Sequence, residues 1–362
     1  MKKLRWILLA VVAAAALIAL VLPRLLPEER RPAGGGLSLW YSERDCPRET
    51  MEAWLSAYAQ ETGEEIAAVS FADEDALAEA FETRQPTLML CSHVRAAGID
   101  ERLGLAHLNS LPPEPSALED ALSGLDGAFF PIGGRVTLLL TDAERIGYDF
   151  DSFEELLRAA AEADAPFLAA ESWTELLYQT MYMHGRQMSG LIAEDSRDAV
   201  YTALYNALAE AAYEGGLAQV FDPAEYVRQG LLPCAVVSSS ALAGLEGRAL
   251  RACPLPVPEG GHEGCSGELM GFAVVNAGRN ASPAKSFLQW LAAGEHRAAM
   301  ALDAGLVPLD KTEAAPDANA FDRLLTELAA GGQLRYPAPT LPYFANRIQG
   351  ESELRERLDL LR

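Results

Sequence analysis

Few residues of this chain stand in the patterns that catalysis or phosphate binding requires. Ser238, Ser239 and Ser240 follow an apolar run, yet no serine lies in the GxSxG pattern of a hydrolase nucleophile. The chain contains no GxxxxGK[ST] or GxGxxG loop, and its five histidines form no HxH, HExxH or HxxxH pair. The sequence therefore predicts no catalytic residue, no cofactor and no metal ion. The serine run is either a turn or helix cap, or a loop that contacts a ligand.

The five cysteines form no CxxC pair. Cys91 and Cys234 each adjoin an apolar run, which is typical of buried thiols that pack as small apolar side chains. Cys253 and Cys265 flank a loop rich in proline and glycine, so a disulfide between them is an open alternative.

Charge and length limit the class of protein. The 362 residues carry 29 Lys and Arg against 52 Asp and Glu, a net charge of −23. Such a surface repels nucleic acid and anionic membranes, and it favours a soluble body with no nucleic-acid partner. Because domains usually contain about 100–200 residues, the length predicts two lobes.

The N-terminus carries an export pattern. Lys2, Lys3 and Arg5 precede 17 uncharged, mostly apolar residues at 6–22. This run is long for a signal peptide and just long enough to span a bilayer, so we expect a transmembrane signal anchor or a cleaved signal peptide. Residues 30–36 (RRPAGGG) read as a flexible tether, and the folded body should start near Leu37, outside the cytoplasm.

Strands and helices alternate in the first part of the body. Apolar runs at 37–41, 66–71 and 87–90 predict strands, and amphipathic segments predict helices after Pro47 and from Asp75 to Phe81. This alternation indicates an α/β protein with a mostly parallel, helix-covered sheet. Ligands of such sheets bind beyond the carboxyl ends of the strands.

Comparable signals continue along the chain. Ser152 and Ser172 each begin a capping box, and Asp222 precedes a proline at a helix start. Further strands are predicted at 135–141, 167–170, 231–237 and 269–275, and further helices at 152–163, 197–213, 282–291, 295–302, 321–330 and 351–361.

Four stretches in this order resemble the extracellular solute-binding proteins of ABC importers, particularly the family that includes many sugar binders. They begin at Leu37 (LSLWYS), Thr87 (TLMLCSHVRAAGIDERLGLAHLN), Phe129 (FFPIGGRVTLLLTDAERIGYD) and Gly267 (GELMGFAVVNAGRNASPAKSFLQWLAAGEHRAAMALDAGLVPLDK). Two features depart from that family. The segment CSH at 91–93 stands where an acidic residue or Trp is frequent, and CAVVSSSAL at 234–242 lacks a Gly-Trp element.

The resemblance implies a two-lobed periplasmic-binding-protein-like fold, with each lobe a helix-covered mixed sheet. The first lobe would comprise 37–130 with 259–303, and the second 135–253 with 306–345. Residues 346–362 would form a C-terminal helix. The segments crossing between the lobes would lie near 130–137, 254–258 and 302–308.

The resemblance also implies where a ligand is held, between the lobes and at strand ends and helix starts. The ligand-binding candidates are Trp40, Tyr41, Ser42, Ser92, His93, Phe130, Arg135, Trp173, Ser239, Ser240, Glu268 and Gly271. Of the aromatic pair Trp40 and Tyr41, we expect at least one to pack in the core. Arg135 would clamp a carboxylate of the ligand or form an ion pair at the surface, and Gly271 would admit ligand or backbone, or mark a bulge.

The implied function is capture of a small polar ligand, most plausibly a carbohydrate, by closure of a hinge. The protein would be a monomer outside the cell, anchored or secreted, and would deliver its ligand to ABC permease subunits. One alternative is a membrane-anchored sensor or scaffold with the same fold and no transport role. Another is a hydrolase, although nothing in the sequence marks converging catalytic groups.

Overall fold

The structure, a computed structural model, describes residues 37–336 apart from 110, 112–117, 148, 174–198, 246–248, 262–264, 294, 311–312, 317 and 332–333. The predicted signal segment at 1–36 and C-terminal helix at 346–362 lie outside this part, as does Glu175 of the second capping box. Within the described residues, no helix is long and apolar enough to span a bilayer. The anchor and the signal peptide therefore stay predictions.

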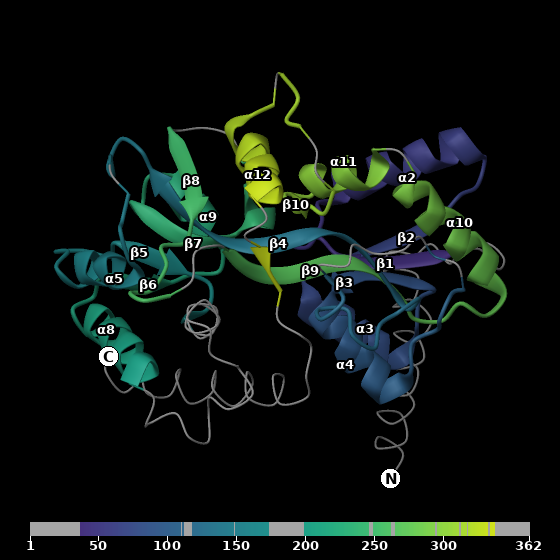
Figure 1. Ribbon diagram of the computed structural model, residues 1–362, viewed down its shortest axis with the longest axis horizontal. Helices are drawn as coiled ribbons and strands as arrows, with labels where there is room; N and C mark the ends of the chain where they lie inside the picture. The colour runs from purple at the N-terminus through teal and green to yellow at the C-terminus, as the bar shows by residue number, and fades with distance from the viewer. Residues whose placement is uncertain are drawn as a thin grey trace, which may run out of the picture. The chain divides into compact units, whose positions relative to one another are not determined.

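The described part is built on one mixed sheet of eleven strands (Figure 1). Its main path runs β2-β1-β3-β9-β4-β7-β5-β6, with β8 and β10 paired to β4 and β11 paired to β9. The strands are β1 Ser38–Ser42, β2 Ala67–Phe71, β3 Leu88–Ser92, β4 Phe129–Asp142, β5 Leu168–Ala170, β6 Leu217–Gln219, β7 Cys234–Ser238, β8 Leu250–Pro254, β9 Cys265–Val274, β10 Val307–Pro308 and β11 Leu334–Arg335. The predicted α/β class with helix-covered mixed sheets is confirmed.

Strand direction divides the sheet. β1 lies parallel to β2 and β3, and β5 lies parallel to β6 and β7. Between these two parallel groups, β9 runs antiparallel to β3 and β4, and β4 runs antiparallel to β7. We call β2, β1, β3, β9 and the start of β4 the first half, and the end of β4 with β7, β5, β6 and β8 the second half.

β4 belongs to both halves. Its residues from Phe129 to Val136 pair with β9, and those from Thr137 onwards pair with β7 and β8. Just before this change, a Cβ at Gly134 would lie 1.9 Å from the hydroxyl oxygen of Tyr336, so the Tyr336 side chain would have to move to accommodate it. The segment 130–137, predicted to cross between two lobes, is therefore part of one continuous strand.

Helices cover both faces of each half. In the first half, α2, α10 and α11 pack on one face and α3 and α4 on the other (Figure 1). In the second half, α5 and α8 pack on one face and α9 and α12 on the other. The helices are α2 Arg48–Thr62, α3 Glu74–Thr83, α4 His93–Leu103, α5 Phe153–Ala161, α8 Ala199–Tyr213, α9 Pro223–Arg228, α10 Ala281–Ala292, α11 His296–Asp303 and α12 Ala320–Gly331, with the 3-10 turn η4 at Ser239–Leu242.

Each half consequently has its own apolar cores. In the first half, the rings of Tyr58 and Phe272 meet Phe287 edge to face, with centroids 5.2 and 5.4 Å apart. In the second half, the fully buried Phe153 packs with residues of α5, α8 and β5. Val94, at the start of α4 in the first half, packs into this second-half core. The two halves are thus in direct contact beside the strand ends.

Local sequence signals set several element boundaries as predicted. Ser152 caps α5 by accepting a hydrogen bond from the Glu155 amide at 3.1 Å, and Asp222 caps α9 in the same way through the Glu225 amide. Gly63 ends α2 with a φ of 74°, which a residue without a side chain adopts readily. β6, β10 and β11 were not predicted, because they have only three, two and two residues and exist through pairing with a neighbouring strand. β8, with five residues, was also not predicted.

Candidate ligand-binding site

Polar and charged residues gather at the carboxyl ends of the parallel strands in both halves. β3 ends at Ser92, and the residues that follow the strands β1, β3, β5, β6 and β7 are Glu43 to Asp45, His93 with Val94, Glu171 to Trp173, Phe221 with Asp222, and Ser239 with Ser240. Ligands of open α/β sheets bind at this position, because loops and helix starts present polar groups there. We call the ion-paired residues Arg44, Asp45, Glu74, Arg95, Arg135, Glu171 and Glu268 the charged seam.

Arg135 of β4 stands at the centre of the charged seam. Its Nη1 lies 2.6 Å from Oδ1 of Asp45, and its Nη2 lies 2.8 Å from Oε2 of Glu268. Glu74 is 3.8 Å away and is itself paired with Arg95 at 3.2 Å. Of the two predicted roles for Arg135, the structure therefore displays the ion pair.

Burial makes these ion pairs energetically important. Asp45 is only 3% exposed, and this burial raises its pKa to about 7, although the Arg135 guanidinium counteracts part of the rise. Burial lowers the pKa of Arg135, but the carboxylates of Asp45 and Glu268 outweigh that effect and leave it above its ordinary value. Arg135 therefore stays charged, and Asp45 is the acid of this group most easily protonated.

Arg44 joins the two halves. It follows β1 in the first half, and its Nη1 forms an ion pair with Oε1 of Glu171, which follows β5 in the second half. The Cζ of Arg44 also lies 3.8 Å from the ring centroid of Phe221, which follows β6. The strand ends of the two halves therefore face each other closely enough for one side chain to bridge them.

The predicted hydroxyl and imidazole candidates are mostly buried and bonded to backbone. Ser42 accepts a hydrogen bond from the Arg44 amide, and Ser92 caps α4 through the Arg95 amide. Nδ1 of His93 accepts from the Leu269 amide at 3.1 Å, and Ser239 accepts from the Val136 amide at 3.2 Å. Ser240 shares a 2.8 Å hydrogen bond with Ser238. Ser238 caps the 3-10 turn η4 by accepting a hydrogen bond from the Ser240 amide, so the predicted cap role of the serine run is confirmed, and its contact with a ligand stays a prediction.

The predicted aromatic candidates lie in the cores. Trp40, Tyr41, Phe130 and Trp173 are 8%, 2%, 0% and 5% exposed. The expectation that at least one of Trp40 and Tyr41 packs in the core is confirmed, and ligand contact by any of the four stays a prediction.

Gly271 admits backbone rather than a side chain. A Cβ at this position would lie 2.3 Å from the carbonyl oxygen of Phe130, and the register of β4 shifts just beside it, between Pro131 and Gly133. The predicted close approach of backbone is therefore confirmed.

Sequence reasoning missed six residues of this region: Arg44, Asp45, Glu74, Arg95, Glu171 and Phe221. Arg44 and Asp45 directly follow the predicted strand at 37–41, and Glu171 directly follows the one at 167–170, so their positions carried a usable signal. Phe221 carried none, since β6 was not predicted.

Two solved structures that resemble this chain are named as solute-binding or transport proteins. A cyclic alpha-maltosyl-1,6-maltose binding protein from Arthrobacter globiformis matches with a TM-score of 0.62 and 15% identity, over 91% of this chain and 97% of its own. A protein assigned as a spermidine/putrescine ABC transporter from Listeria monocytogenes matches with a TM-score of 0.57 and 12% identity, over 89% of this chain and 99% of its own. No protein-family model and no curated protein sequence matches the chain.

The chain has the fold of ABC-transporter solute-binding proteins.

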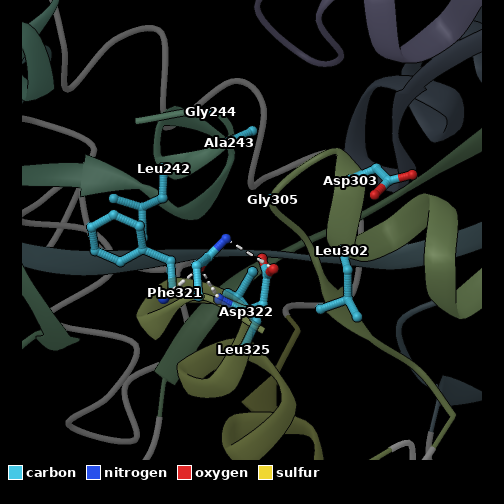
Figure 2. A pocket seen from close by; sticks show the side chains of 10 residues that line it. Leu242, Ala243, Gly244, Leu302, Asp303, Gly305, Phe321, Asp322 and Leu325 are labelled. Atoms are coloured by element: carbon cyan, nitrogen blue, oxygen red, sulfur yellow. Dashed lines mark hydrogen bonds between the residues drawn. The ribbon is translucent and has the colours of Figure 1, made fainter. Parts of the chain in front are cut away.

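A cavity of about 180 Å³ lies between η4, the end of α11 and the start of α12, and no residue of the charged seam lines it (Figure 2). Its two acids are engaged within the protein. Asp303 accepts a hydrogen bond from Nε1 of Trp54 at 2.9 Å, and Asp322 accepts one from Nδ2 of Asn319 at 2.9 Å. Their carboxylates also lie apart (Figure 2), so the cavity lacks a converging set of polar groups.

All five cysteines of this solute-binding fold are free. Cys91 and Cys234 are buried, as predicted, and the alternative of a Cys253–Cys265 disulfide is not formed in this structure. Among the residues the structure describes, no group of three or more His, Cys, Asp or Glu side chains is arranged to hold a metal ion.

Proposed function

We propose that this chain is an extracytoplasmic solute-binding protein, without enzymatic activity, that captures a small polar ligand between the two halves and presents it to an ABC permease. The observation that carries the proposal is the convergence of charged strand ends from both halves, bridged by Arg44 and Glu171. The fold shared with two solute-binding proteins supports it. The predicted export pattern supports a location outside the cytoplasm.

The halves act as the two lobes of a hinge. Each has its own cores, and β4 links them as a continuous strand whose pairing changes between Val136 and Thr137. A ligand that contacts both strand-end groups binds the closed arrangement better than the open one, and so shifts the population towards closure. The lobes correspond to 37–130 with 259–303 and to 135–253 with 306–345, and the protein works as a monomer.

Carbohydrate is the first ligand class that the resemblance suggests, and one structural neighbour is named as a binder of a cyclic maltosyl-maltose. Sugar rings commonly stack on exposed aromatic side chains. In this chain the four predicted aromatic candidates are buried, and the exposed aromatic at the strand ends is Phe221, at 72%. The test therefore includes charged solutes beside sugars.

The proposal is tested by thermal shift of the full chain against sugars, polyols, amino acids, polyamines and small anions. A ligand at about 100 times its dissociation constant adds about 2.7 kcal/mol of stability. We expect one chemical class to raise the melting temperature in a saturable manner, with one ligand bound per chain by calorimetry. The absence of a saturable shift with every class would contradict ligand capture.

A further inference from the structure

The side chain of Arg44 lies in a site formed by Glu171 and Phe221 of the second half, which we call the seat. Phe221 contacts the face of the guanidinium, with 3.8 Å between Cζ and the ring centroid, and Glu171 forms an ion pair at its edge. An aromatic face and a carboxylate at the edge together match both recognition surfaces of a delocalised cation. The seat thus already has the chemistry of a cation-binding site.

The seat stands on paired strands. Glu171 directly follows β5, and Phe221 follows β6, two residues beyond its end at Gln219. β5 and β6 are paired in parallel, with Ala170 opposite Gln219. The Val220 amide also donates to the Ala170 carbonyl at 3.1 Å, so the sheet holds the backbones that carry Glu171 and Phe221 side by side.

The Arg44 side chain is held in the seat by contacts that are exposed to solvent. The side chains of Arg44 and Glu171 are 34% and 54% exposed, and Phe221 is 72% exposed with the guanidinium beside it. Exposed ion pairs and exposed cation–π contacts are individually weak, so a cation from solution competes with Arg44 for the seat.

The surrounding charge favours a cation. The charged seam contains four carboxylates (Asp45, Glu74, Glu171 and Glu268) and three guanidiniums (Arg44, Arg95 and Arg135). When the Arg44 side chain is displaced, Glu171 loses the guanidinium with which it is paired in this structure. The net charge of −23 on the whole chain adds a long-range attraction for cations.

We propose that Glu171 and Phe221 form the binding site for an organic cation, a guanidinium or ammonium compound, which displaces the Arg44 side chain that occupies the site in this structure. This inference rests on the proposed function and names its ligand class. Arg44 is then an internal competitor, and the cation takes over its contacts between ring and carboxylate.

The test is isothermal titration of the full chain with agmatine, which carries a guanidinium and an ammonium group, with putrescine, and with maltose as a neutral probe. We expect agmatine and putrescine to bind and maltose not to bind. Glu171→Gln and Phe221→Ala should each weaken agmatine binding about tenfold, since each removes one recognition surface. Arg44→Ala should strengthen it about three- to tenfold, because the competitor is lost.

Arg228→Ala is the matched control, because Arg228 forms an exposed ion pair with Glu225 on α9. It should leave agmatine binding unchanged, and circular dichroism establishes that each variant is folded. Binding of agmatine that is unaffected by Glu171→Gln and Phe221→Ala overturns the inference. Weaker binding in Arg44→Ala also overturns it, since Arg44 would then be a closing contact.

The outcomes separate the inference from the proposed function. Binding of maltose without binding of either cation overturns the cation site and leaves solute capture standing. If agmatine, putrescine and maltose all fail to bind, and no solute of the thermal-shift panel binds either, both the cation site and the proposed solute capture are contradicted.

Discussion

Replacing Arg135 by Met measures how strongly the charged seam depends on its central guanidinium. The substitution removes the partner that lies 2.6 Å from Asp45, a carboxylate with only 3% exposure, and 2.8 Å from Glu268. Breaking a buried ion pair by deleting one member costs about 3–5 kcal/mol, because the remaining charge has lost its compensation. We expect the free energy of unfolding to fall by about that amount at pH 8.

The cost should depend on pH in a defined direction. Burial places the folded-state pKa of Asp45 at about 7, above the unfolded value of about 3.9. Its contribution to stability is therefore full below pH ~4 and is lost as the pH rises through the folded-state pKa. Without Arg135, which lowers that pKa, the loss grows. At pH 5 the Asp45 carboxyl takes up a proton, so Arg135→Met should be less harmful there.

The assay is urea unfolding followed by tryptophan fluorescence at pH 5 and pH 8. Asp45→Asn in the Arg135→Met background should recover much of the loss at pH 8, because no buried carboxylate is left to ionise at that position. Arg228→Met, which removes one member of an exposed pair, is the control and should change stability by at most about 1 kcal/mol. A cost below 1 kcal/mol for Arg135→Met, or an equal cost at both pH values without recovery by Asp45→Asn, would refute the reasoning.

Three further substitutions test packing, each by thermal unfolding. Gly271→Ala should destabilise the protein by about 1–3 kcal/mol, because its Cβ would stand 2.3 Å from a carbonyl oxygen of β4. Gly147→Ala, with no atom within 4 Å of the new Cβ, is the control and should be nearly neutral. Equal effects of the two substitutions would contradict the clash. Ser239→Ala should cost about 1–3 kcal/mol by removing the buried acceptor of the Val136 amide, and no loss would mean that this hydrogen bond contributes nothing. Phe287→Ala should cost about 3–5 kcal/mol because it empties the centre of a first-half core, and a cost under 1 kcal/mol would place that ring outside the core.

The elements that local signals define were predictable in most of the chain. Periodicity located α2 and α10, and caps at Ser152 and Asp222 located the starts of α5 and α9. These features depend on residues within a few positions of one another, so the sequence carries them directly. Short strands such as β6 carry few residues, and pairing with β5 is what makes β6 a strand.

The sequence predicted where in the fold the site lies, but only some of the residues that form it. The rule that ligands bind at strand ends led to Arg135, Glu268 and the serine run, all of which lie in this region. It did not reveal that Trp173 packs in a core, because a side chain after a strand can turn towards solvent or towards a covering helix. That choice depends on which helix packs there, and helix packing is a tertiary property.

The sequence alone determined the α/β class, the order of the elements, the acidity of the surface and the absence of recognisable catalytic motifs, since these follow from composition and from patterns of short range. Only the tertiary structure decided that Arg44 bridges to Glu171, 127 residues away, and that Asp45 and Glu268 meet on Arg135. Contacts between residues so distant along the chain arise from the pairing of β4 with strands of both halves. No local pattern encodes that pairing, because it depends on the geometry of the whole sheet.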